Sequence, residues 1–297
     1  MDNVLEKILA ARRANPYSPE KSIEDLRTEH AAGGAEVPLP EGTQFEACDA
    51  GGVPSEIIET EDTNAKRWFL FIHGGGYYRG SVAATRSTAA RISAVTGAKV
   101  LSIDYRLAPE HAYPAAIDDT YAAYRWLLDQ GHDPAQLMVG GISAGGGLTL
   151  ALLLRLRDEG DPLPAGAVPM SPWTDLTQSG ESFATNAEND PIISKGYLDR
   201  MAGLYLNGAD ARTPYASPLH GDLSGLPPLL IQVGSAETMR DDSVAFARKI
   251  ERAGGKAMLE VWPDMFHGWH GSAHLLSDAE LAIERIGEFF ASHVETQ

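Results

Sequence analysis

Short, almost continuous apolar runs that alternate with helical patterns constrain the fold of this chain more than any other feature. Such runs are typical of strands that are buried on both faces. Their alternation with helices predicts right-handed crossovers and a mostly parallel sheet with helices on both sides. Two alternating runs, 43–48 and 55–59, are joined across Gly51-Gly52 and predict an antiparallel hairpin at the sheet edge. The result is an α/β fold of about eight strands, with apolar runs at 67–72, 99–103, 137–139, 165–170, 228–233 and 257–262 and helices at 83–95, 114–130, 146–159, 242–253 and 278–293.

Two segments do not fit this alternation. Almost sixty residues separate the run that ends at Met170 from the run that begins at Pro228, which is too long for a simple crossover. This stretch contains a predicted helix at 194–206. Residues 1–42 contain one or two helices that have no place on the sheet. We therefore expect residues 43–297 to form the main domain, with a cap made by an insertion at about 177–212 and by the N-terminal helices.

Composition and charge exclude several classes of protein. No apolar run approaches the roughly 20 residues that cross a bilayer, and the N-terminus is a mixed-charge amphipathic helix, so a cytoplasmic protein is expected. The formal charge of −17, from 41 acidic and 24 basic residues, argues against nucleic-acid and membrane partners. The single cysteine, Cys48, excludes an internal disulfide framework.

A G-x-S-x-G pattern, Gly141 to Gly145, lies between a predicted strand and a leucine-rich helix. This is the context of a nucleophile elbow, in which a serine occupies a strained turn between strand and helix. Ser143 would then lie at the N-terminus of the helix, where free amides favour developing negative charge. The alternative is a glycine-rich turn that only packs a helix against the sheet.

A serine nucleophile needs a base and an acid, and both should follow other strands. His267 lies in the loop after the last apolar run, and Glu237 is the first carboxylate after the preceding one. Asp241 is the next choice for the acid, although Asp241 and its neighbour Asp242 are typical of a helix start. The weaker alternatives are Asp190 and Asp264.

The histidines 267, 270 and 274 also have a spacing that could bind a metal. Helical ligation would need a sustained helix, and Gly268 and Gly271 argue against one. No metal and no cofactor are therefore expected.

The sequence His73-Gly74-Gly75-Gly76 follows directly after the first buried strand. Its bare amides would lie beside the elbow, so Gly74, Gly75 and Ala144 are predicted to form an oxyanion hole. A flexible turn is the alternative. The order of glycine loop, Ser143, Glu237 and His267 is that of an α/β-hydrolase triad.

At these residues the chain resembles the hormone-sensitive-lipase-type carboxylesterases of the α/β-hydrolase superfamily, over roughly residues 40–290. Many members have Asp where this chain has Glu237, so the acid departs from the commonest pattern. The supporting stretches are HGGGYYRGS (73–81), DYRLAPEHAYPAA (104–116), GISAGG (141–146), SPWTDL (171–176) and DMFHGW (264–269). The resemblance implies an α/β-hydrolase fold with a helical cap over the acyl pocket, and a bracing role for Asp104, Arg106 and Glu110 beneath the oxyanion loop.

The function expected from these features is hydrolysis of short- to medium-chain acyl esters through an acyl-enzyme. Tyr77, Tyr78, Trp173 and Asp190 are the predicted pocket walls. The same triad would also serve a lactonase, a deacetylase or an amidase, and a non-catalytic receptor of the same fold would lack the base. Edge strands and the final helix allow a homodimer, which the sequence does not decide.

Overall fold

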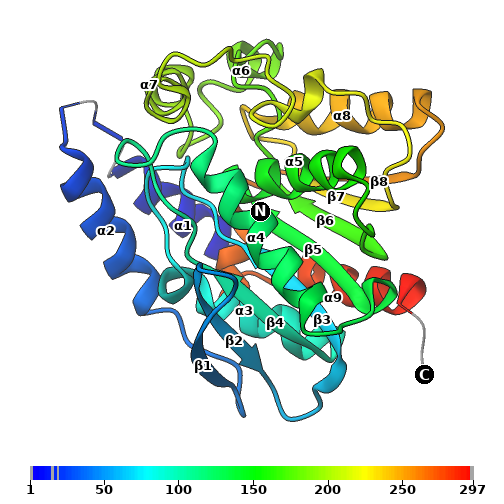
Figure 1. The fold of residues 1–297 in the computed structure, drawn as a ribbon. Helices are drawn as coiled ribbons and strands as arrows, with labels where there is room; N and C mark the ends of the chain where they lie inside the picture. Colours follow the sequence, from blue (N-terminus) through cyan, green and yellow to red (C-terminus); the bar gives the residue numbers. More distant parts are fainter. Residues whose placement is uncertain (1–2, 15–16, 19, 295–297) are drawn as a thin grey trace.

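A single mixed sheet forms the centre of the protein. The computed structural model describes residues 3–14, 17–18 and 20–294. The strands are β1 (Gln44–Asp49), β2 (Pro54–Glu59), β3 (Asn64–Ile72), β4 (Ala98–Ile103), β5 (Leu137–Ile142), β6 (Gly166–Met170), β7 (Leu229–Gly234) and β8 (Ala257–Trp262). In the described part of the chain these eight strands are arranged in the order β1-β2-β4-β3-β5-β6-β7-β8 (Figure 1).

The strand directions agree with the sequence. β1 and β2 form the predicted antiparallel edge hairpin, and β2 also pairs antiparallel with β4. Every other pair is parallel. The predicted α/β fold with its mostly parallel sheet is therefore confirmed. The carboxyl-terminal ends of β3, β5, β7 and β8 therefore lie at the same end of the sheet. The predicted glycine loop, serine, acid and base follow these strand ends.

Helices cover both faces of this sheet (Figure 1). Successive side chains of a strand point to opposite faces. Phe69 and Phe71 accordingly enter a core with α3 (Val82–Thr96) and α9 (Ser277–His293), while Leu70 and Ile72 enter a second core. All four side chains are fully buried, and burial of each contributes about 1.5–3 kcal/mol. The second core and its neighbour contain α4 (Ala115–Asp129), α5 (Ala144–Glu159) and α8 (Arg240–Arg252).

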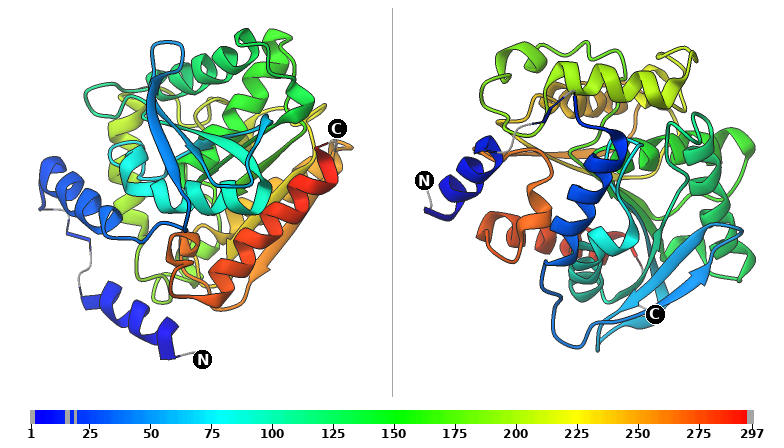
Figure 2. Two further views of the ribbon diagram at one scale, coloured as in Figure 1. Left: turned by 90° about the horizontal axis from the view of Figure 1, so that it is seen from below. Right: turned by 90° about the vertical axis from the view of Figure 1, so that its left-hand side faces the viewer.

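The segment between the two N-terminal helices contacts the long insertion, which lies between β6 and β7. The N-terminal helices are α1 (Asn3–Ala14) and α2 (Ile23–Ala35), and the insertion carries α6 (Ser182–Thr185) and α7 (Lys195–Leu206). Arg200 of α7 donates hydrogen bonds to the Tyr17 hydroxyl (2.6 Å) and the Lys21 carbonyl (3.3 Å). The rings of Tyr17 and Tyr197 meet edge to face with centroids 4.6 Å apart. Figure 2 shows α1 and α2 beside the end of the molecule that α6 and α7 cover.

Arg27 of α2 fixes this helix to the segments near the predicted oxyanion loop. Its guanidinium donates to the Tyr78 carbonyl (2.7 Å), to the Ala108 carbonyl (2.9 Å) and to both carboxylate oxygens of Glu110. Asp104 accepts a hydrogen bond from the Val82 amide at the start of α3. These contacts support the bracing role that the resemblance implies for Glu110 and Asp104.

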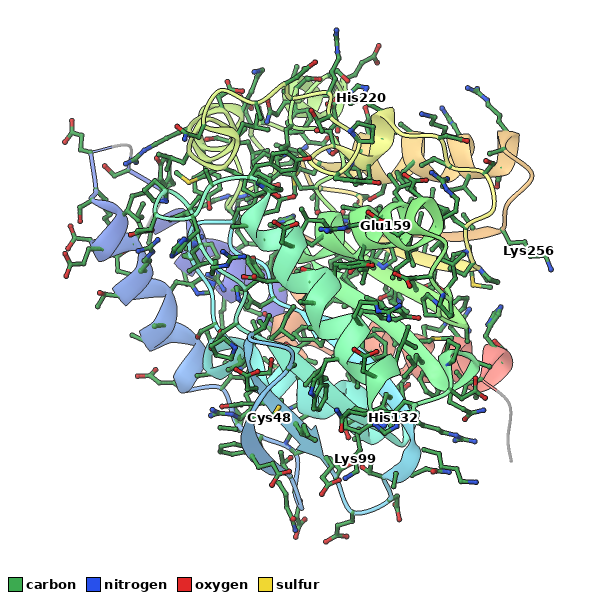
Figure 3. All side chains as sticks on the ribbon, in the orientation of Figure 1. Cys48, Lys99, His132, Glu159, His220 and Lys256 are labelled. Atoms are coloured by element: carbon green, nitrogen blue, oxygen red, sulfur yellow. The ribbon has the colours of Figure 1, made fainter. Side chains whose placement is uncertain are left out.

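The single cysteine lies away from these strand ends. Cys48 is on β1 of the edge hairpin, is half-buried, and is a free thiol (Figure 3). Among the helices in the described ranges, none combines the length and the apolar character that crossing a bilayer requires.

Two helical glycines provide a matched test of this packing. A Cβ at Gly287 of α9 would lie 2.6 Å from the Val95 carbonyl oxygen and 3.0 Å from the Val95 Cβ, whereas a Cβ at the exposed Gly203 of α7 would meet nothing within 4 Å. We expect Gly287→Ala to lower the free energy of unfolding by about 1–3 kcal/mol. We expect Gly203→Ala to raise it by about 0.5–1 kcal/mol, because alanine is the better helix former. Urea unfolding followed by circular dichroism measures both, and equal effects would contradict the close contact of α3 with α9.

Candidate active site

Ser143 occupies a strained turn between β5 and α5. Its φ of 59° and ψ of −119° cost a non-glycine residue about 1–3 kcal/mol. Hydrogen bonds hold this conformation: the Ser143 amide donates to the Met170 carbonyl (2.9 Å), and the Ser143 carbonyl accepts from the amides of Trp173 and Gly147. The backbone of Ser143 therefore has the strained conformation that was predicted for an elbow between strand and helix.

The glycines that flank Ser143 allow β3 and β5 to approach closely. A Cβ at Gly145 would lie 2.1 Å from the Ile72 carbonyl oxygen, and one at Gly141 would lie 2.5 Å from the same atom. Any side chain at either position would force the backbone apart. The G-x-S-x-G spacing is thus explained by the contact between the elbow and the end of β3.

The glycine loop after β3 lies against the elbow. A Cβ at Gly74 would be 2.8 Å from the Ile142 carbonyl oxygen and 3.3 Å from the Ser143 Cβ. Gly75 has a φ of 119°, which a residue with a side chain rarely adopts. Among the residues that the structure describes, none accepts a hydrogen bond from the amides of Gly74, Gly75 or Ala144. Three free donors therefore lie beside the serine.

His73 supports this loop from below. It is fully buried, and its Nδ1 donates to the Gly74 carbonyl at 2.7 Å. Its ring stacks on Tyr105 with centroids 4.2 Å apart, and the Tyr105 hydroxyl donates to the His73 carbonyl. Burial lowers the pKa of His73, so its imidazole is neutral at ordinary pH. His73 therefore fixes the loop rather than exchanging protons.

His267 and Glu237 meet in a buried hydrogen bond. The His267 Nδ1 lies 2.8 Å from the Glu237 Oε2, and both side chains are almost inaccessible to solvent. The other oxygen of Glu237 accepts from the Ser171 hydroxyl (2.7 Å) and from the Gly234 amide (2.6 Å). The carboxylate thus has three protein donors, which compensate for its burial.

The pKa of His267 reflects two opposing effects. Burial lowers it, because the imidazolium loses hydration, while the hydrogen bond to Glu237 and the charge of that carboxylate raise it. The net result is a pKa above the ordinary histidine value. His267 can therefore accept a proton readily, and its second ring nitrogen remains available for that purpose.

The other candidate acids have different partners. Asp190 accepts from the amides of Ile192 and Ile193 with one oxygen, and from the Thr238 amide with the other. It thereby ties the insertion to the loop of Glu237. Asp241 accepts from the Ser182 amide. Asp264 is exposed, and its backbone amide donates to the Ser235 hydroxyl.

The remaining histidines of the metal-like spacing do not converge on His267. The His270 Nε2 lies 3.0 Å from the Gln232 Oε1, and burial lowers the pKa of His270 to about 3. His270 therefore remains neutral inside the core. In residues 3–14, 17–18 and 20–294, no group of three or more His, Cys, Asp or Glu side chains is placed to hold a metal ion.

Ser143 and His267 line one cavity of about 300 Å³. Its walls are the glycine loop, the N-terminal helices and the insertion, which contributes Ile192, Ile193, Tyr197 and Leu198. These four residues could not be identified from the sequence alone, because only long-range packing brings the insertion over the elbow. They follow the Asn-Asp-Pro turn that opens the predicted helix, which is the one local signal of their position.

The predicted pocket walls have other partners in the structure. Tyr77 is buried and stacks on Tyr205 with centroids 3.8 Å apart. The indole of Trp173 is buried and donates to the Asp175 carbonyl. The Tyr78 hydroxyl is 3.3 Å from the Tyr197 hydroxyl. These aromatic side chains and Asp190 are not among the residues that line the cavity beside Ser143, and their contact with a substrate stays a prediction.

Asn186 was not singled out by the sequence. Its side-chain amide donates to the carbonyls of Ser235 (2.9 Å) and Glu237 (2.8 Å). It thus fixes the loop that carries the acid from a position 51 residues away. No local pattern in the insertion marks an asparagine with this role.

Comparisons with known proteins agree with this geometry. A family described as having the alpha/beta hydrolase fold matches residues 69–271. An acetyl-hydrolase of Streptomyces hygroscopicus is 47% identical over 223 residues, which are 75% of each chain. An esterase of Acinetobacter venetianus is 37% identical over 81% of this chain and 80% of its own. The crystal structure of an esterase from the bacterial hormone-sensitive lipase family has 43% identity and a TM-score of 0.97 over 99% of both chains.

Asp242 at the start of α8 stabilises the loop behind the elbow. Its Oδ2 accepts from the backbone amides of Thr174 (2.8 Å) and Asp175 (3.0 Å), directly after Trp173. Asp242 thus lies in the first turn of α8, as the sequence predicts, but its carboxylate binds a separate loop instead of an amide of its own helix. Burial raises the pKa of Asp242 to about 8, and the nearby charge of Asp175 adds to this effect.

This raised pKa predicts a pH-dependent stability. An unfolded aspartate has a pKa of about 3.9, so between that value and the folded one only the folded protein keeps the proton. The contribution of Asp242 is therefore fully present below the unfolded pKa and is lost as the pH rises towards 8. We expect the unfolding free energy of the wild type, relative to Asp242→Asn, to decrease by at most about 1.4 kcal/mol per pH unit. Urea unfolding across this range measures it, with the half-buried Asp241→Asn as control; a constant difference would contradict the prediction.

Proposed function

This chain belongs to the α/β-hydrolase fold family, and we propose that it is a serine carboxylesterase that hydrolyses short- to medium-chain acyl esters. Ser143 is the nucleophile, His267 is the general base and Glu237 is the acid that orients it. The observation that carries this proposal is the buried His267–Glu237 hydrogen bond at a cavity that His267 shares with the strained Ser143.

In the acylation step, the Ser143 Oγ attacks the ester carbonyl while the His267 Nε2 takes its proton. The negative charge that develops on the carbonyl oxygen is stabilised by the free amides of Gly74, Gly75 and Ala144. The C–O bond to the alcohol then breaks, and His267 returns the proton to the leaving alcohol. Glu237 keeps the Nδ1 proton in place and stabilises the imidazolium without accepting that proton.

Deacylation repeats these steps with water. His267 takes a proton from a water molecule as its oxygen attacks the acyl carbon. The bond from the Ser143 Oγ to that carbon breaks, Ser143 regains its proton from His267, and the carboxylic acid leaves. All proton transfers use His267, so the reaction requires no cofactor.

The insertion and the N-terminal helices serve as the cap of this site. Ile192, Ile193 and Leu198 supply apolar cavity walls, and the contacts of Arg200 with the segment at Tyr17 hold the two parts of the cap together. A cavity of about 300 Å³ is at the small end of the range for ligand pockets. Short acyl chains therefore suit the site better than long ones.

Removal of acetyl groups is a second candidate on the same residues. It is favoured by one observation, the 47% identity to a protein named acetyl-hydrolase. Acetate is the smallest acyl group of the proposed series, so the chain-length preference separates the two candidates.

Ser143→Ala tests the nucleophile. With p-nitrophenyl esters from acetate to palmitate, we expect the wild type to be most active on short chains and the variant to lose on the order of 10⁴-fold in kcat/KM, because no acyl-enzyme forms. Ser224→Ala, on an exposed loop, is the control. A variant as active as the wild type would exclude the triad. If the wild type binds esters without turnover, the protein is a receptor. If it cleaves anilides faster than matched esters, it is an amidase.

Glu237→Gln tests the acid and the pKa of the base together. Loss of the carboxylate should lower kcat by roughly 10³–10⁴-fold, because the imidazolium is no longer stabilised. It also leaves burial as the main influence on His267, so the fall of kcat/KM on the acid side should move to lower pH. Asp241→Asn is the matched control and should leave the profile in place. An unchanged pH profile in Glu237→Gln, or a shifted pH profile in Asp241→Asn, would contradict the assignment of Glu237 as the acid.

A further inference from the structure

The cavity beside Ser143 contains two arginines without an acidic partner. Arg12 of α1 and Arg79 of the glycine loop both line it. Within the described parts of the chain, neither guanidinium lies within salt-bridge distance of a carboxylate, although Asp and Glu outnumber Lys and Arg by 41 to 24 in the whole sequence. Several other arginines in the described parts of the chain also lack a carboxylate partner, so the feature that distinguishes these two is their position at the cavity.

Arg79 lies directly beside the predicted oxyanion hole. A Cβ built on Gly75 would be 3.1 Å from the Arg79 Cγ, so the stem of the side chain passes along that glycine. The guanidinium carbon is 5.4 Å from the centre of the Tyr78 ring and 5.9 Å from that of Tyr197. These rings hold the cation in place through its interaction with their faces.

Among residues 3–14, 17–18 and 20–294, none accepts a hydrogen bond from the guanidinium of Arg79. Its Nε is buried and has no hydrogen-bond partner among the described residues. Arg79 as a whole is only partly buried, but its Nε is buried without an acceptor, and this costs free energy that a bound acceptor would restore. The unpaired donor therefore points to an acceptor that the substrate brings.

The other ionisable groups at the cavity do not supply that acceptor. Glu29 is paired with Lys21, whose Nζ is 2.7 Å from one carboxylate oxygen and 2.9 Å from the other. His30 is kept neutral, because burial and the charge of Arg79 lower its pKa to about 3. Arg12 is exposed at the cavity and lies close enough to Arg79 for the two positive charges to interact. The two arginines thus repel each other, and the one carboxylate that lines the cavity, that of Glu29, is already paired with Lys21.

We propose that Arg79, assisted by Arg12, forms a subsite for a carboxylate of the substrate, so that the preferred esters carry a carboxylate close to the ester bond. This inference rests on the proposed esterase function. The guanidinium fork matches a carboxylate in shape and binds it through two parallel hydrogen bonds. The substrate class is therefore half-esters of small dicarboxylic acids, or O-acylated hydroxy acids, and the ester chemistry at Ser143 is unchanged.

The experiment compares substrates that differ only in charge. Monoethyl succinate and ethyl succinamate place a carboxylate or a carboxamide on the acyl side, and 4-acetoxybenzoate and 4-acetoxybenzamide place them on the alcohol side. We expect the wild type to prefer the carboxylate in one of the two pairs by about tenfold or more in kcat/KM, as a charge-assisted hydrogen bond allows. The pair that shows the preference identifies the side of the ester on which Arg79 acts.

Substitutions assign the preference to the arginines. Arg79→Gln keeps a polar side chain without the charge and should bring the ratio of kcat/KM values close to unity, while Arg79→Lys should retain part of it. Arg12→Gln should reduce the ratio less. Arg13→Gln changes the neighbouring exposed arginine, which does not line the cavity, and should leave the ratio unchanged.

The outcomes separate the subsite from the esterase. Hydrolysis of both pairs without preference, or a preference that survives in Arg79→Gln, would overturn the subsite and leave the esterase intact. If the wild type hydrolyses none of these esters, the proposed esterase function is wrong, and the subsite proposal falls with it. If Arg79→Gln does not fold, added salt gives the test on the wild type, because screening should reduce a preference that depends on charge. A preference that is independent of salt would contradict the subsite.

Discussion

The close approach of the ends of β3 and β5 is the constraint on which the site depends. The Ile72 carbonyl lies where side chains at Gly141 and Gly145 would be, so only glycine on both sides of Ser143 permits the contact. The same contact brings the glycine loop within reach of the serine and leaves three amides free beside it. The hydrogen bonds to Met170 and Trp173 then hold the strained turn. Strain at Ser143 is thus balanced by backbone interactions of the neighbouring strand, and the side chain is left exposed to the cavity.

A second set of contacts holds Glu237 and His267, the proposed acid and base. Glu237 is bound by Ser171, Gly234 and His267. Asp190 and Asn186 of the insertion bind the same loop from the opposite side. The insertion therefore has two functions: it supplies cavity walls, and it fixes the segment that positions the acid. Changes in the insertion should be felt at His267 even where they leave the cavity wall untouched.

Much of this architecture could be predicted from the sequence, because it depends on local patterns. The six apolar runs marked β3 to β8 and the two alternating runs marked β1 and β2, and the position of Glu237 and His267 after two of the apolar runs was sufficient to pair these residues. What the sequence could not predict is contacts between distant segments. Tyr77 and Trp173 are buried aromatic residues near the elbow, and the insertion residues Ile192 and Tyr197 that line the cavity carry no local signal of their own. Asp242 lies in the first turn of α8, as its sequence predicted, but its hydrogen bonds to Thr174 and Asp175 are revealed by no local pattern.

The charges around His267 connect the two halves of the site. Burial and the charge of Arg79 lower its pKa, whereas Glu237 and Asp190 raise it. A general base works best when its pKa lies near the working pH. The groups that lower the pKa of His267 and the groups that raise it are therefore both needed. A buried histidine without Glu237 would be too weak a base, as His270 illustrates with a pKa of about 3 in similar burial. Without Arg79, the carboxylates would raise the pKa of His267 further and keep it protonated over a wider range of pH. The positive charge in the cavity is therefore part of the environment that sets the strength of the base.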